Sequence, residues 1–262
     1  MDTPKTETRH GQDRNTIETR ILTVGRMFVW SVCLLALMQV SSSCSVVTDI
    51  CTDVTSVQDE IVNLHNVFRR GVSPSATNML KMNWSREAAV SAQNWANTCS
   101  MVHGDPSTRM LGTYQMGENL FKSTGMVKWT SVVTAWHNEV ANYVYPTGSA
   151  NTQPIGHYTQ VVWYSSYSVG CGAAKCGSNY FYVCHYYRAG NFKGVAPYTQ
   201  GQSCAACPGA CDDKLCTNPC PHVNKYSNCA SLVAALKCTY PRMTDWCPAS
   251  CLCSGKIIPV GK

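Results

Sequence analysis

The sequence predicts an α+β domain followed by a small disulfide-rich domain, and three observations lead to this prediction. Apolar residues recur at helical spacing in three stretches between residues 57 and 143. Strand-like stretches follow between residues 158 and 187, and this segregation of helices from strands favours α+β over a parallel α/β fold. Ten of the 17 cysteines then lie between Cys204 and Cys253, a density typical of oxidised, secreted domains with small cores.

Residues 1–43 are expected to be a leader and signal peptide, followed by a short N-terminal segment at 44–56. Residues 27–40 are almost continuously apolar, and Ser41, Ser42 and Ser43 then provide small residues for cleavage. Because a membrane-spanning helix needs about 20 apolar residues, cleavage and secretion are favoured over a signal anchor. The acidic residues before this run are unusual in a signal sequence, so translation from Met27 stays open as an alternative.

Three helices are predicted in the first part of the domain. The first begins at Val57 and ends before Gly71 and Pro74. The second follows Ser85, the predicted N-cap, and a third amphipathic stretch covers residues 127–143. The buried face of the second helix is expected to consist of small residues and one indole: Ala88, Ala89, Ala92, Trp95 and Ala96.

Three strands are predicted at 158–163, 168–174 and 180–187. The first has two β-branched residues and an indole, which suit a buried strand. It would hold His157 at the mouth of a sheet, where an imidazole can act as a metal ligand or as an acid or base. A core histidine that is hydrogen-bonded to a neighbour is the alternative.

Composition and missing motifs exclude several functions. The net charge of +6 is spread without a Lys/Arg block, so no nucleic-acid partner is expected. Neither a Gly-x-Ser-x-Gly elbow nor a His-Glu-x-x-His helix is present. The cysteines are expected in disulfides, which disfavours a thiol nucleophile, and their varied spacing disfavours zinc knuckles. The sequence therefore predicts a non-enzymatic protein.

Two long motifs resemble the signatures of the CAP superfamily: GHYTQVVWYSS at 156–166 and YVCHYYRAGNF at 182–192. Residues 60–66 and 73–84 look like the opening of that domain. The cysteine spacing from Cys204 to Cys253 is similar to that of the cysteine-rich secretory proteins. The resemblance implies a three-layer α-β-α sandwich at 57–200, a disulfide-stapled hinge at 201–219, a mostly helical ion-channel-regulatory (ShKT-like) domain at 220–253 and a tail at 254–262. Within this last domain one helix is predicted, at 229–236.

The resemblance also implies a disulfide pairing. In the CAP domain the pairs are Cys99–Cys176 and Cys171–Cys184, and in the hinge they are Cys204–Cys211 and Cys207–Cys216. The terminal domain would contain Cys220–Cys253, Cys229–Cys247 and Cys238–Cys251. Two further cysteines, Cys44 and Cys51, are expected to pair with each other. One family bridge is absent, because Met116 and Tyr187 stand where the family has two paired cysteines.

Four residues match the tetrad of the CAP superfamily: His103, Glu118, Glu139 and His157. They come from four separate segments, and their convergence in a cleft is implied by the resemblance. Two neutral imidazoles can hold a zinc ion while water fills its open positions. We therefore expect His103 and His157 as weak zinc ligands, with Glu118 and Glu139 beside them or on the metal's water. Alternatively, the four side chains only bond one another and join their segments.

The terminal domain resembles a toxin-type potassium-channel-binding module. A basic residue beside an aromatic one can occupy a cation pore or its vestibule. The candidate contacts are Lys225, Tyr226, Lys237, Tyr240, Arg242 and Trp246. Trp246 is favoured among them as an exposed interface anchor. A solvated surface without a partner is the alternative.

Asn83-Trp84-Ser85 is an N-glycosylation sequon, although the expected burial of Trp84 and the adjacent helix start count against its use. As a whole, the sequence predicts a secreted binding protein that modulates an ion channel or another cell-surface protein and has a metal-binding cleft. Two alternatives stay open. One is a zinc-dependent peptide hydrolase. The other is a sterol or lipid carrier, suggested by the aromatic residues between Tyr143 and Tyr187, which ordinary sheet packing also explains.

Overall fold

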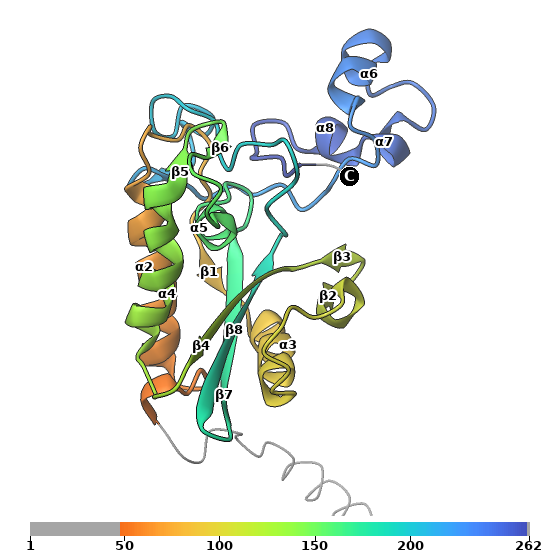
Figure 1. Cartoon of the computed structure of the whole chain (residues 1–262). Helices are drawn as coiled ribbons and strands as arrows, with labels where there is room; N and C mark the ends of the chain where they lie inside the picture. The colour runs from red at the N-terminus through yellow and green to blue at the C-terminus, as the bar shows by residue number, and fades with distance from the viewer. Residues whose placement is uncertain (1–47, 261–262) are drawn as a thin grey trace, which may run out of the picture. The chain divides into compact units, whose positions relative to one another are not determined.

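The computed structural model describes residues 48–260 (Figure 1). The expected leader and signal peptide, and Cys44 with them, lie outside the described residues. Within the described part, no helix combines the length and the apolar character that a membrane crossing requires.

A four-stranded sheet forms the centre of the larger domain, in the order β1-β7-β8-β4. Its long central strands are β7 (Ser168–Cys176) and β8 (Asn179–Tyr187), which confirm two predicted strands and extend both by one or two residues. β4 (Gly117–Ser123) pairs antiparallel with β8, and the short β1 (Asn83–Trp84) runs parallel to β7. Neither of these two outer strands was predicted.

Helices cover both faces of this sheet, which makes the domain a three-layer α-β-α sandwich. Figure 1 shows α2 (Thr55–Arg70) and α4 (Trp129–His137) together on one face and α3 (Arg86–Asn97) on the other. Gly170 and Gly172 in β7 allow the close approach of α3, because a Cβ atom at either position would overlap the helix backbone. The fold is therefore α+β, as the sequence predicts.

The first two predicted helices are confirmed. α2 begins two residues before the predicted Val57 and is capped by Gly71, and the Ser85 hydroxyl accepts a hydrogen bond from the Ala88 amide at the start of α3. The third is shorter than predicted. α4 ends at His137, the chain continues as the 3-10 helix η3 (Asn138–Asn142), and Val140 is exposed.

The predicted strand at 158–163 is wrong. Residues Gly156–Val161 form the short helix α5, and the chain turns after it. Tyr158, Val161 and Val162 are buried as expected, but against α2, α4 and the sheet. A short apolar run does not distinguish a buried helix from a buried strand, since one turn of helix is too short to show its period.

Short elements complete the larger domain. Two are 3-10 helices, η1 (Thr48–Ile50) and η2 (Pro106–Arg109). Two are small hairpins: β2 (Met110–Leu111) with β3 (Tyr114–Gln115), and β5 (Tyr143–Val144) with β6 (Gly148–Ser149).

Arg69, near the end of α2, joins several loops from inside the core. Its side chain is buried, and burial lowers its pKa to about 9, so it remains a cation at neutral pH. The guanidinium donates to five backbone carbonyls, those of Leu80, Val161, Trp163, Tyr164 and Ser166. Arg69 alone thus supplies hydrogen-bond donors to five buried carbonyls.

The hinge packs on the larger domain. Its small hairpin consists of β9 (Cys211–Asp212) and β10 (Leu215–Cys216), and Leu215 belongs to the main hydrophobic core. The Cys216 amide donates to the Met79 carbonyl, and its carbonyl accepts from the Lys81 amide. Removing the hinge would therefore open the core of the larger domain.

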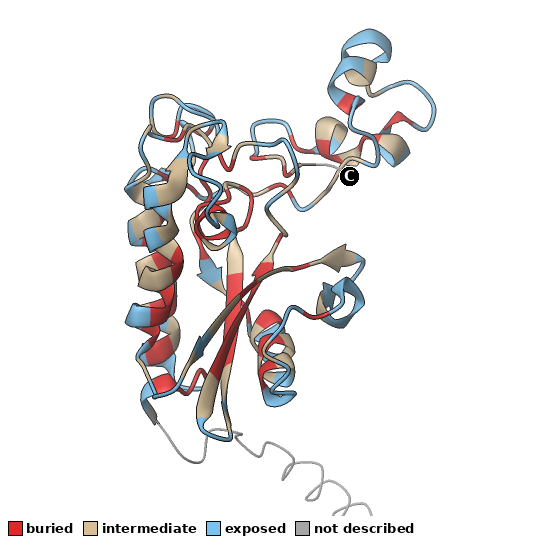
Figure 2. Ribbon diagram, in the orientation of Figure 1, coloured by how far each residue is buried: buried red, intermediate tan, exposed pale blue. Residues whose placement is uncertain are grey.

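The terminal domain contains three short helices. α6 (Cys229–Leu236) has the predicted bounds, while α7 (Met243–Trp246) and α8 (Pro248–Leu252) were not predicted. Figure 2 shows many buried residues on the sheet and the inward sides of its helices, and few in the terminal domain.

Seven disulfides join described residues, and they are the seven pairs that the resemblance implies. Cys51 is also disulfide-bonded. Cys44, its expected partner, lies outside the described residues.

Candidate metal-binding cleft

His103 and Glu118 form the first half of the tetrad. His103 follows α3, and its Nδ1 lies 2.7 Å from Oε1 of Glu118 in β4. The same oxygen accepts from the Gly104 amide at 3.2 Å, and Nη1 of Arg109 lies 3.6 Å away. The Glu118 side chain is only 1% exposed, whereas that of His103 is 59% exposed. Glu118 is therefore the buried member of this pair, and His103 is the member that solvent reaches.

A third histidine, His185, holds the other oxygen of Glu118. In the antiparallel register of β4 and β8, His185 lies directly opposite Glu118, and its Nε2 is 3.1 Å from Oε2. Its Nδ1 lies 3.0 Å from the hydroxyl of Ser91 in α3. His185 stands in the second CAP-like motif, but only the strand register brings it to Glu118, so the sequence did not reveal this role.

The surroundings of Glu118 keep it ionised. Burial opposes the charged form, but hydrogen bonds from His103 and His185 and the charge of Arg109 outweigh it. Together they lower the pKa of Glu118 to about 2. A carboxylate at neutral pH accepts from both imidazoles and fixes their orientation.

His157 and Glu139 form the second half of the tetrad. Glu139 lies in η3, and its Oε1 is 2.7 Å from Nδ1 of His157. Its Oε2 accepts from the amides of His157 and Tyr158, at 2.8 and 3.1 Å. The glutamate thus satisfies free amides at the start of α5 and orients the imidazole in the same contact.

Asn119 connects the two halves. It follows Glu118 in β4, and its side-chain amide donates to the His157 carbonyl at 3.1 Å and to the Tyr186 hydroxyl at 3.3 Å. The tetrad therefore gathers around one end of β4, although its residues come from four separate segments.

Each tetrad histidine uses Nδ1 for its glutamate, which leaves Nε2 as the ring nitrogen available to a ligand. A carboxylate on one imidazole nitrogen and a metal on the other is the usual arrangement at protein zinc sites. The free Nε2 of each tetrad histidine is therefore a donor of the type that zinc accepts.

A second cluster with ligand-type atoms is not a metal site. Among the described residues, only Cys204, Cys207 and Cys216 bring three such atoms within 4.8 Å of one another. Their sulfurs already belong to the disulfides Cys204–Cys211 and Cys207–Cys216.

The candidate channel contacts lie on the terminal domain, and all but one are exposed. Tyr226 and Tyr240 are 51% and 44% exposed, and the basic candidates Lys225, Lys237 and Arg242 are exposed as well. Trp246 is less exposed than expected. Its indole is half-buried and packs against the cluster of Cys229, Met243 and Cys247. In a domain this small, the large apolar ring is needed inside.

The predicted glycosylation sequon lies at the surface. Asn83 is exposed in β1 and Trp84 is half-buried, so the side-chain amide of Asn83 is accessible.

The aromatic residues between 143 and 187 belong mainly to the core. Tyr158, Trp163, Phe181, Tyr182 and Tyr186 are each at most 1% exposed.

Two family models match this chain. Residues 62–186 match the family described as Cysteine-rich secretory protein family (CAP), and residues 204–258 match the family described as Crisp. The chain belongs to the cysteine-rich secretory protein family. Its CAP domain contains the tetrad, and its Crisp region contains the hinge and the terminal domain.

Solved structures show the same fold. NaASP2, in a crystal structure with Zn2+, is 28% identical over 63% of this chain and 96% of that chain, with a TM-score of 0.54. Na-ASP-1 is 31% identical, with 68% and 50% covered and a TM-score of 0.56. Venom allergen-like protein 4 of Schistosoma mansoni is 27% identical, with 57% and 97% covered and a TM-score of 0.50.

Proposed function

We propose that this chain is a secreted, non-enzymatic binding protein whose CAP domain binds a zinc ion through His103 and His157. The main support is the contact of each imidazole with a glutamate. Nδ1 lies 2.7 Å from a carboxylate oxygen in both pairs, which leaves Nε2 for the metal. The Zn2+ in the NaASP2 structure supports this proposal. Family membership and the disulfides support secretion.

Zinc titration of the full secreted chain tests the cleft. His103→Ala and His157→Ala should each weaken zinc binding by at least about tenfold, and Glu139→Gln by about the same factor through its imidazole. His222→Ala removes a half-buried histidine of the terminal domain and serves as the matched control. Because His103 is mostly exposed, its variant should remain folded. Unchanged zinc affinity in both histidine variants would refute the proposal.

Two histidine ligands favour binding over catalysis. Catalytic zinc sites use three protein ligands and keep a fourth position for water. The described cysteines are in disulfides, so none of them is a free thiol nucleophile. The hydrolase alternative makes a distinct prediction, peptide turnover that needs zinc and disappears in His157→Ala. Such turnover, seen in a preparation of verified purity, would replace the binding proposal.

The terminal domain supports a second candidate function, contact with an ion channel or another membrane protein. We call the exposed residues Lys225, Tyr226, Lys237, Tyr240 and Arg242 the basic–aromatic surface. Three disulfides hold the scaffold beneath it. A rigid scaffold loses little conformational entropy on binding, and its positive charge suits the entrance of a cation channel.

Current recording tests this contact with point variants of the full chain. A truncation at the hinge is unsuitable, because Leu215 belongs to the CAP core. Lys237→Glu and Tyr240→Ala should reduce the effect on voltage-gated potassium or calcium channels by at least about tenfold in effective concentration. Lys122→Glu, an exposed position in β4, is the matched control for added charge. Equal activity of all variants, or none in the wild type, would remove the channel proposal.

A further inference from the structure

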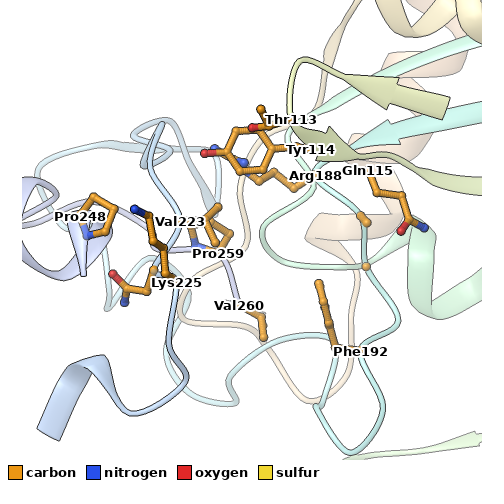
Figure 3. Close-up of a pocket in the computed structure, with 13 residues that line it drawn as sticks. Thr113, Tyr114, Gln115, Arg188, Phe192, Val223, Lys225, Pro248, Pro259 and Val260 are labelled. Atoms are coloured by element: carbon orange, nitrogen blue, oxygen red, sulfur yellow. The ribbon is translucent and has the colours of Figure 1, made fainter. Parts of the chain in front are cut away.

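A cavity of about 470 Å³ lies where the CAP domain meets the terminal domain. Tyr114, Gln115, Arg188 and Phe192 line it from one domain, and Val223 and Lys225 from the other. Figure 3 shows Tyr114 and Arg188 side by side, with Lys225 and Pro248 across the cavity from Phe192 and Gln115. The volume is in the usual range for small-molecule sites, about 300–1,000 Å³.

Arg188 is the unusual group in this wall. It is only 4% exposed, and Nη2 donates to the carbonyl of Pro221. Nε and Nη1 are buried and meet no hydrogen-bond acceptor in the described part of the chain. No described carboxylate lies within ion-pair distance of the guanidinium. A buried cation without a counter-ion is costly, and buried charges in proteins are normally paired.

Aromatic rings cover Arg188. Its guanidinium carbon lies 3.8 Å from the ring centroid of Tyr114 and 4.9 Å from that of Tyr187. Such contacts stabilise a cation only partly, by about 1–2 kcal/mol, and do not neutralise its charge. They keep the planar guanidinium in place beside the cavity.

The rest of the wall adds positive charge and apolar surface. None of the described residues that line the cavity is acidic, and Lys225 brings a second cation. Phe192, Val223, Pro259 and Val260 supply apolar walls. An anion with an apolar body would suit both the positive charge and the apolar walls. Its charge would offset that of Arg188, and its apolar part would fill the rest of the cavity.

We propose that this cavity binds a small organic monocarboxylate with an apolar or aromatic body. The planar carboxylate suits a guanidinium, which can donate two parallel hydrogen bonds to it. Inorganic phosphate is a poorer fit, because it is strongly hydrated and has no apolar part. The site uses no tetrad residue and shares only Lys225 with the basic–aromatic surface, so variants of Arg188 and Gln115 test it separately from both proposed functions.

The competing explanation is that Arg188 serves only to join the domains through Pro221. The two explanations differ in their dependence on ligand charge. If Arg188 is only structural, any preference for the acid comes from Lys225 and should survive in Arg188→Met. A binding arginine selects the acid.

Calorimetric titration of the full chain tests the proposal with naphthalene-2-carboxylate and its neutral isostere, naphthalene-2-carboxamide. We expect the acid to bind at least about tenfold more tightly than the amide, and Arg188→Met to remove this difference. Gln115→Glu places a negative charge on the wall and should weaken the acid several-fold, whereas Gln115→Met, the neutral control, should not. Inorganic phosphate should bind more weakly than the acid.

The two Gln115 variants keep the test decisive if Arg188→Met fails to fold, because Gln115 is only half-buried. Equal binding of acid and amide by the wild type overturns the proposal. So does equal binding of the acid by Gln115→Glu and Gln115→Met, or the absence of any binding of the acid.

Discussion

Trp129, Trp136 and Trp163 are almost completely buried in the CAP domain, whereas the largest residue buried in the terminal domain is Met243. The remaining buried residues of that domain are cysteines and Ala249. Its 34 residues contain three disulfides, while the CAP domain, about four times longer, contains two between described residues.

The comparison shows two ways to stabilise a fold. In the CAP domain, apolar side chains from both layers of helices leave water, and this burial opposes the loss of chain entropy. The terminal domain is too small for such a core, so covalent bridges restrict its unfolded state instead. A domain held by bridges can leave large side chains such as Tyr226 and Tyr240 at its surface, where they are free to contact a partner.

The largest effect is expected from Arg69→Met in the CAP core. Five carbonyls would lose their buried donor, which should lower the free energy of unfolding by about 4 kcal/mol. Denaturant unfolding followed by tryptophan fluorescence measures this loss. Arg70→Met is the control, because its ion pair with Asp213 is partly exposed and should contribute less than about 1 kcal/mol. Similar losses in both variants would contradict the role of Arg69.

Replacement of Cys229 and Cys247 by alanine should act on the terminal domain alone. This bridge closes 18 residues, and its loss should lower local stability by about 3 kcal/mol. Hydrogen exchange should then speed up in residues 220–253, while exchange in the central sheet stays unchanged. If exchange in the sheet rose equally, the two domains would unfold as one unit and the comparison would fail.

The pH dependence of stability should come partly from His65 in the CAP core. Burial lowers the pKa of His65 to about 4, opposed by its hydrogen bond to the Ile61 carbonyl, while the charge of Arg69 lowers it further. Between the unfolded value of 6.5 and this value, the unfolded chain binds the additional proton. Stability should therefore fall by about 2 kcal/mol from pH 7 to pH 5.

His65→Gln should reduce this pH slope, and His222→Gln in the terminal domain should not. Thermal melts at a series of pH values in that range measure both variants. A slope that is the same in the wild type and in His65→Gln would contradict the assignment.

The smallest effect is expected from adding a bridge to the packed domain. With Gly117 opposite Tyr186 in the sheet, the register places Met116 opposite Tyr187, so Met116→Cys with Tyr187→Cys should form the missing family disulfide. The Tyr187 ring would no longer pack on Tyr167 and Arg188, which offsets much of the gain. We expect a net change within about 1 kcal/mol, measured by denaturation with and without reductant. A gain of several kcal/mol would show that the core is less complete than its burial indicates.

Local patterns were sufficient for the long elements. α2 and α3 have a full helical period and clear end signals, and β8 is rich in aromatic residues that favour a strand. The strand expected at 158–163 was wrong, because α5 has only six residues and its buried apolar run has no visible period. β4 was missed for a different reason: it contains two charged residues, Glu118 and Lys122, and only its pairing with β8 makes it a strand.

The sequence by itself determined the α+β class, the long helices and strands, and, through resemblance, the tetrad residues and the bridges between described cysteines. These features depend on residue type and spacing along the chain. Only the tertiary structure decided that each tetrad imidazole faces a glutamate through Nδ1, that His185 lies beneath Glu118, and that Arg188 borders a cavity without a counter-ion. Such contacts join residues that are far apart in the chain. They depend on strand register, on the domain contact and on which ring nitrogen faces its neighbour, none of which leaves a periodic signal in the sequence.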